Sequence, residues 1–177
     1  VFQTRKAEEI VTSVRSYAKE QKLKKSPLSV NEVVTEAVKD FTSTLQDYPL
    51  QIEFEEDPRS PICSLAPLEF ELAVFNLLKN AKEALKAQKA DEPKVFIKIS
   101  SGETHCFVDI SDNGAVISDS DFERMGSVFK SGKASGLGIG LSIVRSIVQN
   151  HNGSLVLERG KNGGLVCRIR LPIFNAE

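Results

Sequence analysis

The stretch Gly136-Leu137-Gly138-Ile139-Gly140-Leu141 and the apolar pattern behind it are the most informative part of this chain. After Leu141, the residues Val144, Ile147 and Val148 recur at the spacing of one helix face. Glycine lacks a Cβ, so the backbone here can approach a bulky anion, which would meet the N–H groups and positive dipole end of the helix. The stretch therefore predicts a phosphate-binding turn, while simple tight packing at a helix start is the alternative.

The overall composition is that of a folded domain in water. Hydrophobic residues make up 41% of the 177 residues and charged residues 27%, and the net charge is −1, so neither a nucleic-acid groove nor a polybasic membrane patch is indicated. No apolar run approaches the roughly 20 residues of a membrane span. We expect a cytoplasmic domain that contacts neither nucleic acid nor membrane. Because the chain starts at Val1, we expect a fragment or a processed product, and attachment of the parent protein to the inner membrane stays open.

The three cysteines do not suggest a metal site. Cys63, Cys106 and Cys167 are too far apart for a local metal knuckle, and an odd number cannot all pair within one chain. Each lies in a strand-like pattern. We therefore predict buried free thiols in a reducing compartment.

Periodicity predicts four helices. Residues 3–24 carry a narrow apolar stripe, which is typical of one helix of a bundle that needs partners, and residues 24–27 are the one candidate linker. Ser29 and Glu32 form a capping box for a second helix that fades near residue 45. A third helix starts at Pro67 and runs to about residue 90, and the fourth follows the glycine stretch.

Alternating apolar residues predict short strands at residues 52–54, 61–64, 95–99, 106–110, 155–157 and 165–169. Hairpins join the two long pairs, which argues against a Rossmann or P-loop fold, and no P-loop motif is present. These elements predict an α/β two-layer sandwich: a mixed, largely antiparallel sheet of about five strands covered by three helices, plus the N-terminal helix. The irregular stretch from 111 to 135 is long enough to be a functional lid.

Two polar clusters interrupt these apolar elements. Asn76 and Asn80 are four residues apart, so they project from one face of the third helix, and amide oxygens suit Mg²⁺. The alternative is a pair of solvated surface asparagines. Asp112-Asn113-Gly114 follows a strand and opens the long irregular stretch, although Asn-Gly is also an ordinary turn dipeptide.

In this order, Asn76–Ala81, Asp112–Gly114, Phe129 and Gly136–Leu141 resemble the catalytic and ATP-binding domain of sensor histidine kinases, over roughly residues 28–173. That family belongs to a wider group with gyrase-type, Hsp90-type and MutL-type ATPases. The resemblance implies an α/β sandwich that holds ATP between helices under a mobile lid.

The resemblance also implies roles for individual residues. Asn80 would coordinate Mg²⁺ and Asn76 would lie near the phosphates or the metal. Asp112 would accept a hydrogen bond from the adenine amino group, and Gly114 would allow close approach to the base. No residue is assigned as catalytic with certainty. The nucleotide-binding set that the resemblance implies is Asn76, Lys79, Asn80, Glu83, Asp112, Gly114, Phe129, Lys130, Lys133, Gly136, Leu137, Gly138, Ile139, Gly140 and Leu141.

The sequence departs from the family pattern in two places near the lid. The family usually continues its aspartate box as Asp-x-Gly-x-Gly, whereas Val116 stands at the position of the second glycine. This substitution puts the backbone geometry and the nucleotide affinity in question. The lid, from Ala115 to Ser135, is also rather short.

The N-terminal helix resembles the second helix of the dimerisation and phosphotransfer bundle, so we expect that fragment at residues 1–26 and the ATP-binding domain at residues 27–177. The bundle helix with the phosphoacceptor is absent. His105 lies in a predicted strand, and His151 follows a helix end and matches the family's His-Gly-Gly region.

We therefore predict a histidine kinase catalytic domain that transfers the γ-phosphoryl group of ATP, with Mg²⁺, to a histidine on a dimerisation domain missing from this chain. The expected partners are ATP, the phosphoacceptor helix of its own homodimer and a cognate response regulator. Two alternatives are a serine-kinase relative of the anti-sigma-factor type and a non-catalytic nucleotide-binding or interaction module, in which the altered region at Val116 would no longer hold ATP.

Overall fold

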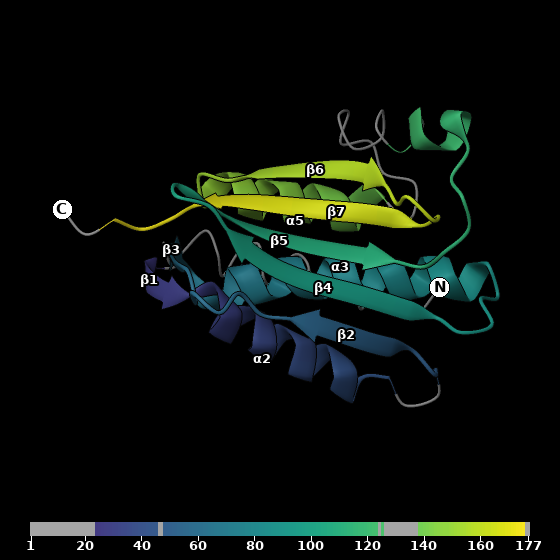
Figure 1. The fold of residues 1–177 in the computed structure, drawn as a ribbon, viewed down its shortest axis with the longest axis horizontal. Helices are drawn as coiled ribbons and strands as arrows, with labels where there is room; N and C mark the ends of the chain where they lie inside the picture. The colour runs from purple at the N-terminus through teal and green to yellow at the C-terminus, as the bar shows by residue number, and fades with distance from the viewer. Residues whose placement is uncertain (1–23, 46–47, 124, 126–137, 176–177) are drawn as a thin grey trace.

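Five strands form the main sheet of this computed structural model, which describes residues 24–45, 48–123, 125 and 138–175 (Figure 1). The strand order is β2-β4-β5-β7-β6. Only the β2–β4 pair is parallel, and the other three pairs are antiparallel. The strands are β2 (Gln51–Glu55), β4 (Lys94–Ser101), β5 (His105–Asp112), β6 (Ser154–Arg159) and β7 (Leu165–Pro172). The prediction of a mixed, largely antiparallel sheet is confirmed.

Three helices cover one face of this sheet, as Figure 1 shows, and the core lies between the two layers. They are α2 (Val30–Ser43), α3 (Pro67–Ala87) and α5 (Gly138–Asn150). The Ser29 hydroxyl accepts a hydrogen bond from the Glu32 N–H at 3.4 Å, so the predicted cap of α2 is confirmed. The helix predicted over residues 3–24 lies outside the described residues except at its last position.

A two-stranded ladder, which the sequence analysis partly missed, stands beside the main sheet. Ser26 and Pro27 were predicted as linker, but they begin β1 (Ser26–Ser29), which pairs antiparallel with β3 (Ile62–Leu65). The linker prediction is therefore wrong at these two positions. A proline fits here because it lies at the start of a short ladder, where a missing N–H donor costs little.

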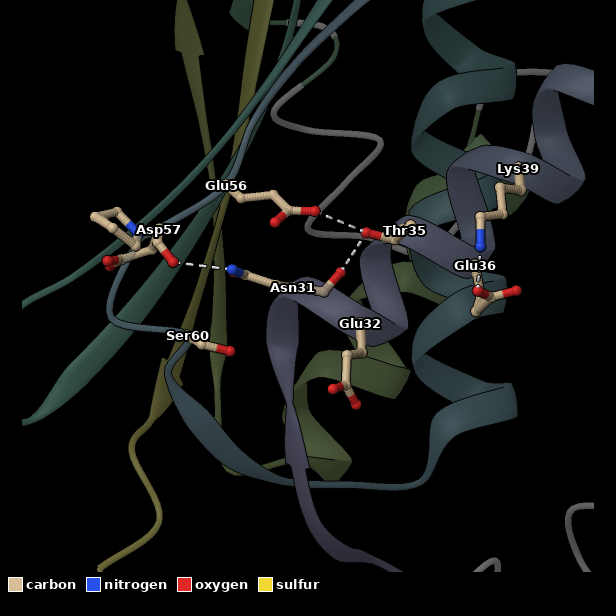
Figure 2. A pocket seen from close by; sticks show the side chains of 9 residues that line it. Asn31, Glu32, Thr35, Glu36, Lys39, Glu56, Asp57 and Ser60 are labelled. Carbon is tan, nitrogen blue, oxygen red and sulfur yellow. Dashed lines mark hydrogen bonds and ion pairs between the residues drawn. The ribbon is translucent and has the colours of Figure 1, made fainter.

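The turn between β2 and β3 fixes the start of α2 against the sheet. The Asp57 side chain is 3% exposed and accepts hydrogen bonds from the Arg59 backbone N–H and the Ser101 hydroxyl. The Asp57 carbonyl accepts one from Asn31 Nδ2 at 2.9 Å (Figure 2). Burial alone would raise the pKa of Asp57, but the bonds from Ser101 and Arg59 outweigh it and lower the pKa. A groove of about 560 Å³, lined mainly by polar side chains of α2 and this turn, lies alongside.

The opposite face of the sheet carries charged side chains in cross-strand pairs. Lys98 bonds Glu55 at 2.7 Å, and Arg168 bonds Asp109 through two nitrogens and reaches Glu158 at 3.4 Å. Such exposed pairs add little stability individually. Their presence shows that this face of the sheet is exposed to solvent, so the hydrophobic core lies on the face that the helices cover.

All three cysteines are free and buried, as predicted. Cys63 and Cys106 belong to the core beside β1 and β7, and Cys167 lies in β7. Burial raises the pKa of Cys167 to about 12, with a further contribution from the negative charge of Asp112. This thiol is therefore neutral at physiological pH and poorly nucleophilic.

Candidate functional site

The two asparagines of α3 face the first turn of α5. A Cβ built on Gly140 would lie 3.0 Å from Asn80 Oδ1, 3.2 Å from Asn80 Nδ2 and 3.6 Å from Asn76 Oδ1. Gly140 thus allows the helix start to approach both amides. The structure brings together the asparagine pair and the glycine stretch, which the sequence analysis singled out separately.

Asn76 and Asn80 differ in how their amides are bonded. Asn76 Nδ2 donates to the Leu72 carbonyl at 2.8 Å, one turn earlier in α3. Asn80 Nδ2 is buried and has no hydrogen-bond partner within the described residues. Both side chains are half-buried, so the alternative of two solvated surface asparagines is wrong. An unpartnered buried amide is costly unless a ligand or water meets it, which makes Asn80 a candidate ligand-contacting residue.

Lys79 and Glu83 lie on the exposed side of α3. Their side chains form an i,i+4 ion pair at 3.8 Å and are each more than half exposed. Both residues were predicted to bind the nucleotide. They lie one turn apart next to Asn80, and in this structure their charged groups bind each other.

Asp112 ends β5 and is held from two directions. Its Oδ1 accepts the Gly114 N–H at 2.9 Å, and its Oδ2 accepts the Leu165 N–H at 3.1 Å. Burial raises the pKa of Asp112 above its ordinary value, although these backbone bonds act in the opposite direction. The two backbone bonds fix the orientation of the carboxylate, and burial removes part of its hydration. These properties are typical of a ligand-binding group and not of a carboxylate that only forms a turn.

A glycine turn between β6 and β7 packs directly on this carboxylate, and the sequence analysis treated it only as a hairpin. Gly164 has φ of +72°, and a Cβ on it would lie 2.0 Å from the Asp112 carbonyl oxygen. Gly163 has φ of +109°, and its Cβ would lie 2.5 Å from the Gly114 carbonyl oxygen. The consecutive glycines were the available signal. Their role becomes visible only when β7 pairs with β5.

Val116 fits the backbone without strain. Within the described part of the chain, the non-glycine residues with positive φ are Ser60, Lys89 and Asn152, so Val116 has an ordinary φ. Its side chain is 81% exposed. The residue before it, Ala115, is fixed through its carbonyl by the Gly164 N–H at 3.0 Å. The valine at the position of the second glycine, which put the backbone geometry in question, therefore requires no unusual φ.

Gln88 is a residue of this site that the sequence analysis missed. It follows α3, and its Oε1 accepts the Ala115 N–H at 2.7 Å. The same oxygen lies 2.7 Å from where a Cβ of Gly114 would be. Nothing in the sequence distinguishes this glutamine from any polar residue at a helix end.

The first part of the predicted irregular stretch is helical. Residues 119–123 form a helical turn, with the Asp121 N–H bonded to the Ser118 hydroxyl at 3.1 Å. Arg159 bonds Asp119 and stacks over the Phe122 ring at 5.1 Å. The prediction of an irregular segment is thus wrong at these residues, which are tied to the end of β6.

Several predicted site residues lie outside what the structure describes. Gly138 and Ile139 begin α5, but nothing is described of the Ile139 side chain, and the Leu141 side chain belongs to the core. The predicted residues outside the described ranges are Phe129, Lys130, Lys133, Gly136 and Leu137.

His151 joins the far ends of α3 and α5. Its Nε2 accepts the Ala66 N–H at 3.0 Å, so the ring proton is on Nδ1, which bonds the Ile147 carbonyl at 2.7 Å. Burial lowers its pKa, and the ring is neutral. His105, in β5, lies beside Thr104 and Arg170. His151 therefore has a packing role at the opposite end of the helix pair that carries Asn80 and Gly140.

Comparison with known proteins places this arrangement in a family. Residues 66–175 match the family of histidine kinase-, DNA gyrase B- and HSP90-like ATPases, and the chain belongs to it. The sensor protein FixL of Bradyrhizobium diazoefficiens is 26% identical over 96% of this chain and 34% of its own length. The C4-dicarboxylate transport sensor protein DctS of Rhodobacter capsulatus is 26% identical over 97% of this chain and 26% of its own length. The chain thus spans about a third of FixL and about a quarter of DctS.

Solved structures share the fold. The catalytic domain of the histidine kinase ThkA superposes with a TM-score of 0.71 at 24% identity, over 84% of this chain and 95% of that one. The ATP-binding domain of PrrB from Mycobacterium tuberculosis gives 0.67 at 24% identity, over 86% and 99%. The described residues therefore have the fold of histidine kinase catalytic domains. Among the residues that the structure describes in this chain, no helix is long and apolar enough to cross a membrane.

Proposed function

We propose that this chain is the catalytic part of a sensor histidine kinase and transfers the γ-phosphoryl group of ATP to a histidine on a dimerisation helix. The observation that carries this proposal is the meeting of Asn76 and Asn80 of α3 with Gly140 in the first turn of α5. Phosphoryl transfer needs mostly positioning and charge neutralisation, so such a site needs no protein nucleophile.

Asp112 is proposed to bind the adenine amino group. Each oxygen of its carboxylate accepts one backbone N–H and keeps a further acceptor position. Gly114, beside it, lacks the Cβ that would lie 2.7 Å from Asp112 Oδ1, so the backbone can come close to this carboxylate. Because both oxygens are held by backbone groups, little side-chain entropy is lost when the base binds.

The site residues fit a magnesium ion. Asn80 offers an amide oxygen, and its Nδ2 has no partner within the described residues. Those residues hold no cluster of three or more acidic, histidine or cysteine ligands, which agrees with the habit of Mg²⁺ to use few protein groups, waters and phosphates. When bound, the ion would neutralise charge on the triphosphate. Asn80 would hold it, with Asn76 beside it.

The remaining assignments follow the family pattern. We propose that the lid residues Phe129, Lys130 and Lys133 and the glycines up to Gly140 close around the phosphates. We also propose that the bundle fragment ends before β1 (Ser26–Ser29), because the expected division after residue 26 would cut this strand. A homodimer whose phosphoacceptor helix receives the phosphoryl group, and a response regulator as the next partner, complete the proposal. The sensor protein names of the relatives support these proposals.

Labelling with γ-labelled ATP and Mg²⁺ tests the function. The chain alone is expected to stay unlabelled, because His151 is buried with both ring nitrogens bonded and His105 lies in a strand. An added phosphoacceptor bundle from a sensor kinase should gain label that acid removes and base does not. Acid-stable phosphoserine would instead favour a serine kinase, and calorimetry without any ATP binding would favour a non-catalytic module.

Removing the amide of Asn80 should weaken the magnesium-dependent part of ATP binding. We expect Asn80→Ala to raise the Kd for ATP by about 10- to 100-fold with Mg²⁺ present, the range typical of lost metal-site groups. With a chelator in place of Mg²⁺, the variant and wild type should bind ATP alike. Lys86→Ala, an exposed change on the same helix, is the control. Equal losses with and without the metal would contradict a metal role.

A further inference from the structure

Two side chains from different elements converge on Gly114. A Cβ at this position would lie 2.7 Å from Asp112 Oδ1 and 2.7 Å from Gln88 Oε1, so the two oxygens are separated by at most twice that distance. Asp112 Oδ1 accepts the Gly114 N–H, and Gln88 Oε1 accepts the next one, from Ala115. The carboxamide of Gln88 therefore stands beside the carboxylate that is proposed to bind adenine.

A carboxamide can do more here than hold a loop. Holding the Ala115 N–H uses only the oxygen of Gln88, and the Nε2 group, with two N–H donors, has no partner among the described residues. Asp112, when ionised, can only accept hydrogen bonds. Adenine presents an amino donor flanked by ring nitrogens that accept, and glutamine amides commonly pair with this edge.

We propose that Gln88 is a second base-recognition residue: its Nε2 donates a hydrogen bond to a ring nitrogen next to the amino group that Asp112 binds. This inference rests on the proposed function, because it presumes ATP in the site. A donor from Gln88 and an acceptor from Asp112 together match the neighbouring amino donor and ring-nitrogen acceptor of adenine. Gln88 also lies at the surface end of α3, where it can reach the base without disturbing the core.

Adenine analogues separate this role from a purely structural one. The wild type, Gln88→Glu and Gln88→Ala would each be titrated by calorimetry with ATP, 7-deaza-ATP and 1-deaza-ATP, which lack one ring nitrogen each. In the wild type, one analogue should bind about 2- to 12-fold more weakly than ATP, the worth of one net hydrogen bond. In both variants that ratio should fall to one.

Gln88→Glu is the decisive variant, because it keeps an oxygen to accept the Ala115 N–H but has no Nε2 donor. Comparing analogue with ATP within one variant also cancels the effect of the added charge. Gln149→Ala, an exposed glutamine on α5, should leave the ratio as in the wild type. A ratio of one for both analogues in the wild type, or an unchanged ratio in Gln88→Glu, would overturn the proposal while ATP binding itself stood. Absence of any ATP binding would overturn the proposed function, and this inference with it.

Discussion

Purified wild-type chain mixed with ATP and Mg²⁺ is expected to release phosphate very slowly. In ATPases of the wider group that this chain resembles, a glutamate one helical turn before the metal-binding asparagine activates the attacking water. Here that position is Asn76, and an amide takes up no proton at neutral pH. Loss of a general base is worth about 10²- to 10⁴-fold in rate, so hydrolysis should fall below that of the glutamate-bearing relatives by this order.

Neither Asn76 itself nor Glu83, on the same helix, is arranged to replace the missing general base. Its Nδ2 is bonded to the Leu72 carbonyl, and the carboxylate one turn beyond Asn80, Glu83, is exposed and paired with Lys79. Phosphate release from Asn76→Glu should exceed that from Asn76→Gln, which has the same length but no base. Rapid phosphate release by the wild type without any acceptor would identify the chain as an ATPase instead.

Asp112→Ala should remove most nucleotide affinity while the fold stays intact. A hydrogen bond to a charged acceptor is worth roughly 1.5–3 kcal/mol, which corresponds to a rise in Kd of about 10- to 150-fold. The matched control is Asp109→Ala, three residues earlier in β5, whose carboxylate bonds Arg168 on the opposite face of the sheet. Calorimetric titration gives the Kd and circular dichroism reports the fold. Normal ATP binding by Asp112→Ala would refute the adenine assignment.

The same carboxyl group makes ATP binding sensitive to acid. Burial raises the pKa of Asp112, so its side chain is fully ionised only well above this raised pKa. The ionised fraction is lost as the pH falls through the pKa. As the pH is lowered, the Kd for ATP should therefore begin to rise at a higher pH than it would if the binding carboxylate belonged to an exposed aspartate. Asp112→Asn, which keeps an acceptor oxygen but does not titrate, should flatten this pH dependence.

Local sequence signals predicted the fold well because they act over a few residues. Ser29 with Glu32 located the start of α2, Pro67 located the start of α3, and alternation located both long hairpins. The strand β1 was missed since four residues containing a proline carry almost no periodic signal. Its formation depends on β3, which lies more than thirty residues further along the chain.

The candidate site could be predicted only where its residues form a motif with regular spacing in the sequence. The asparagine pair and the glycine stretch stood out by composition, and the structure brings Asn80 and Gly140 together. Gln88 did not, because its partner Ala115 lies 27 residues away and any polar residue looks the same at a helix end. Val116 put the backbone geometry in question. The sequence does not reveal that Gly163 and Gly164 are the glycines that pack closely on the backbone of Asp112 and Gly114.

The bond between Asp112 and Leu165 has a consequence for how the molecule assembles. The two residues are 53 positions apart, and each belongs to a different hairpin, β4–β5 or β6–β7. Each hairpin closes locally, whereas their mutual pairing joins segments that are far apart in the sequence and therefore requires closure of a long loop. The carboxylate proposed to bind adenine receives its second backbone bond only when the two hairpins pair, so we expect the nucleotide to bind the assembled sheet and not a partly folded chain. ATP would then act as a folding ligand, adding about 1.4 kcal/mol to the free energy of unfolding for each tenfold excess over its Kd.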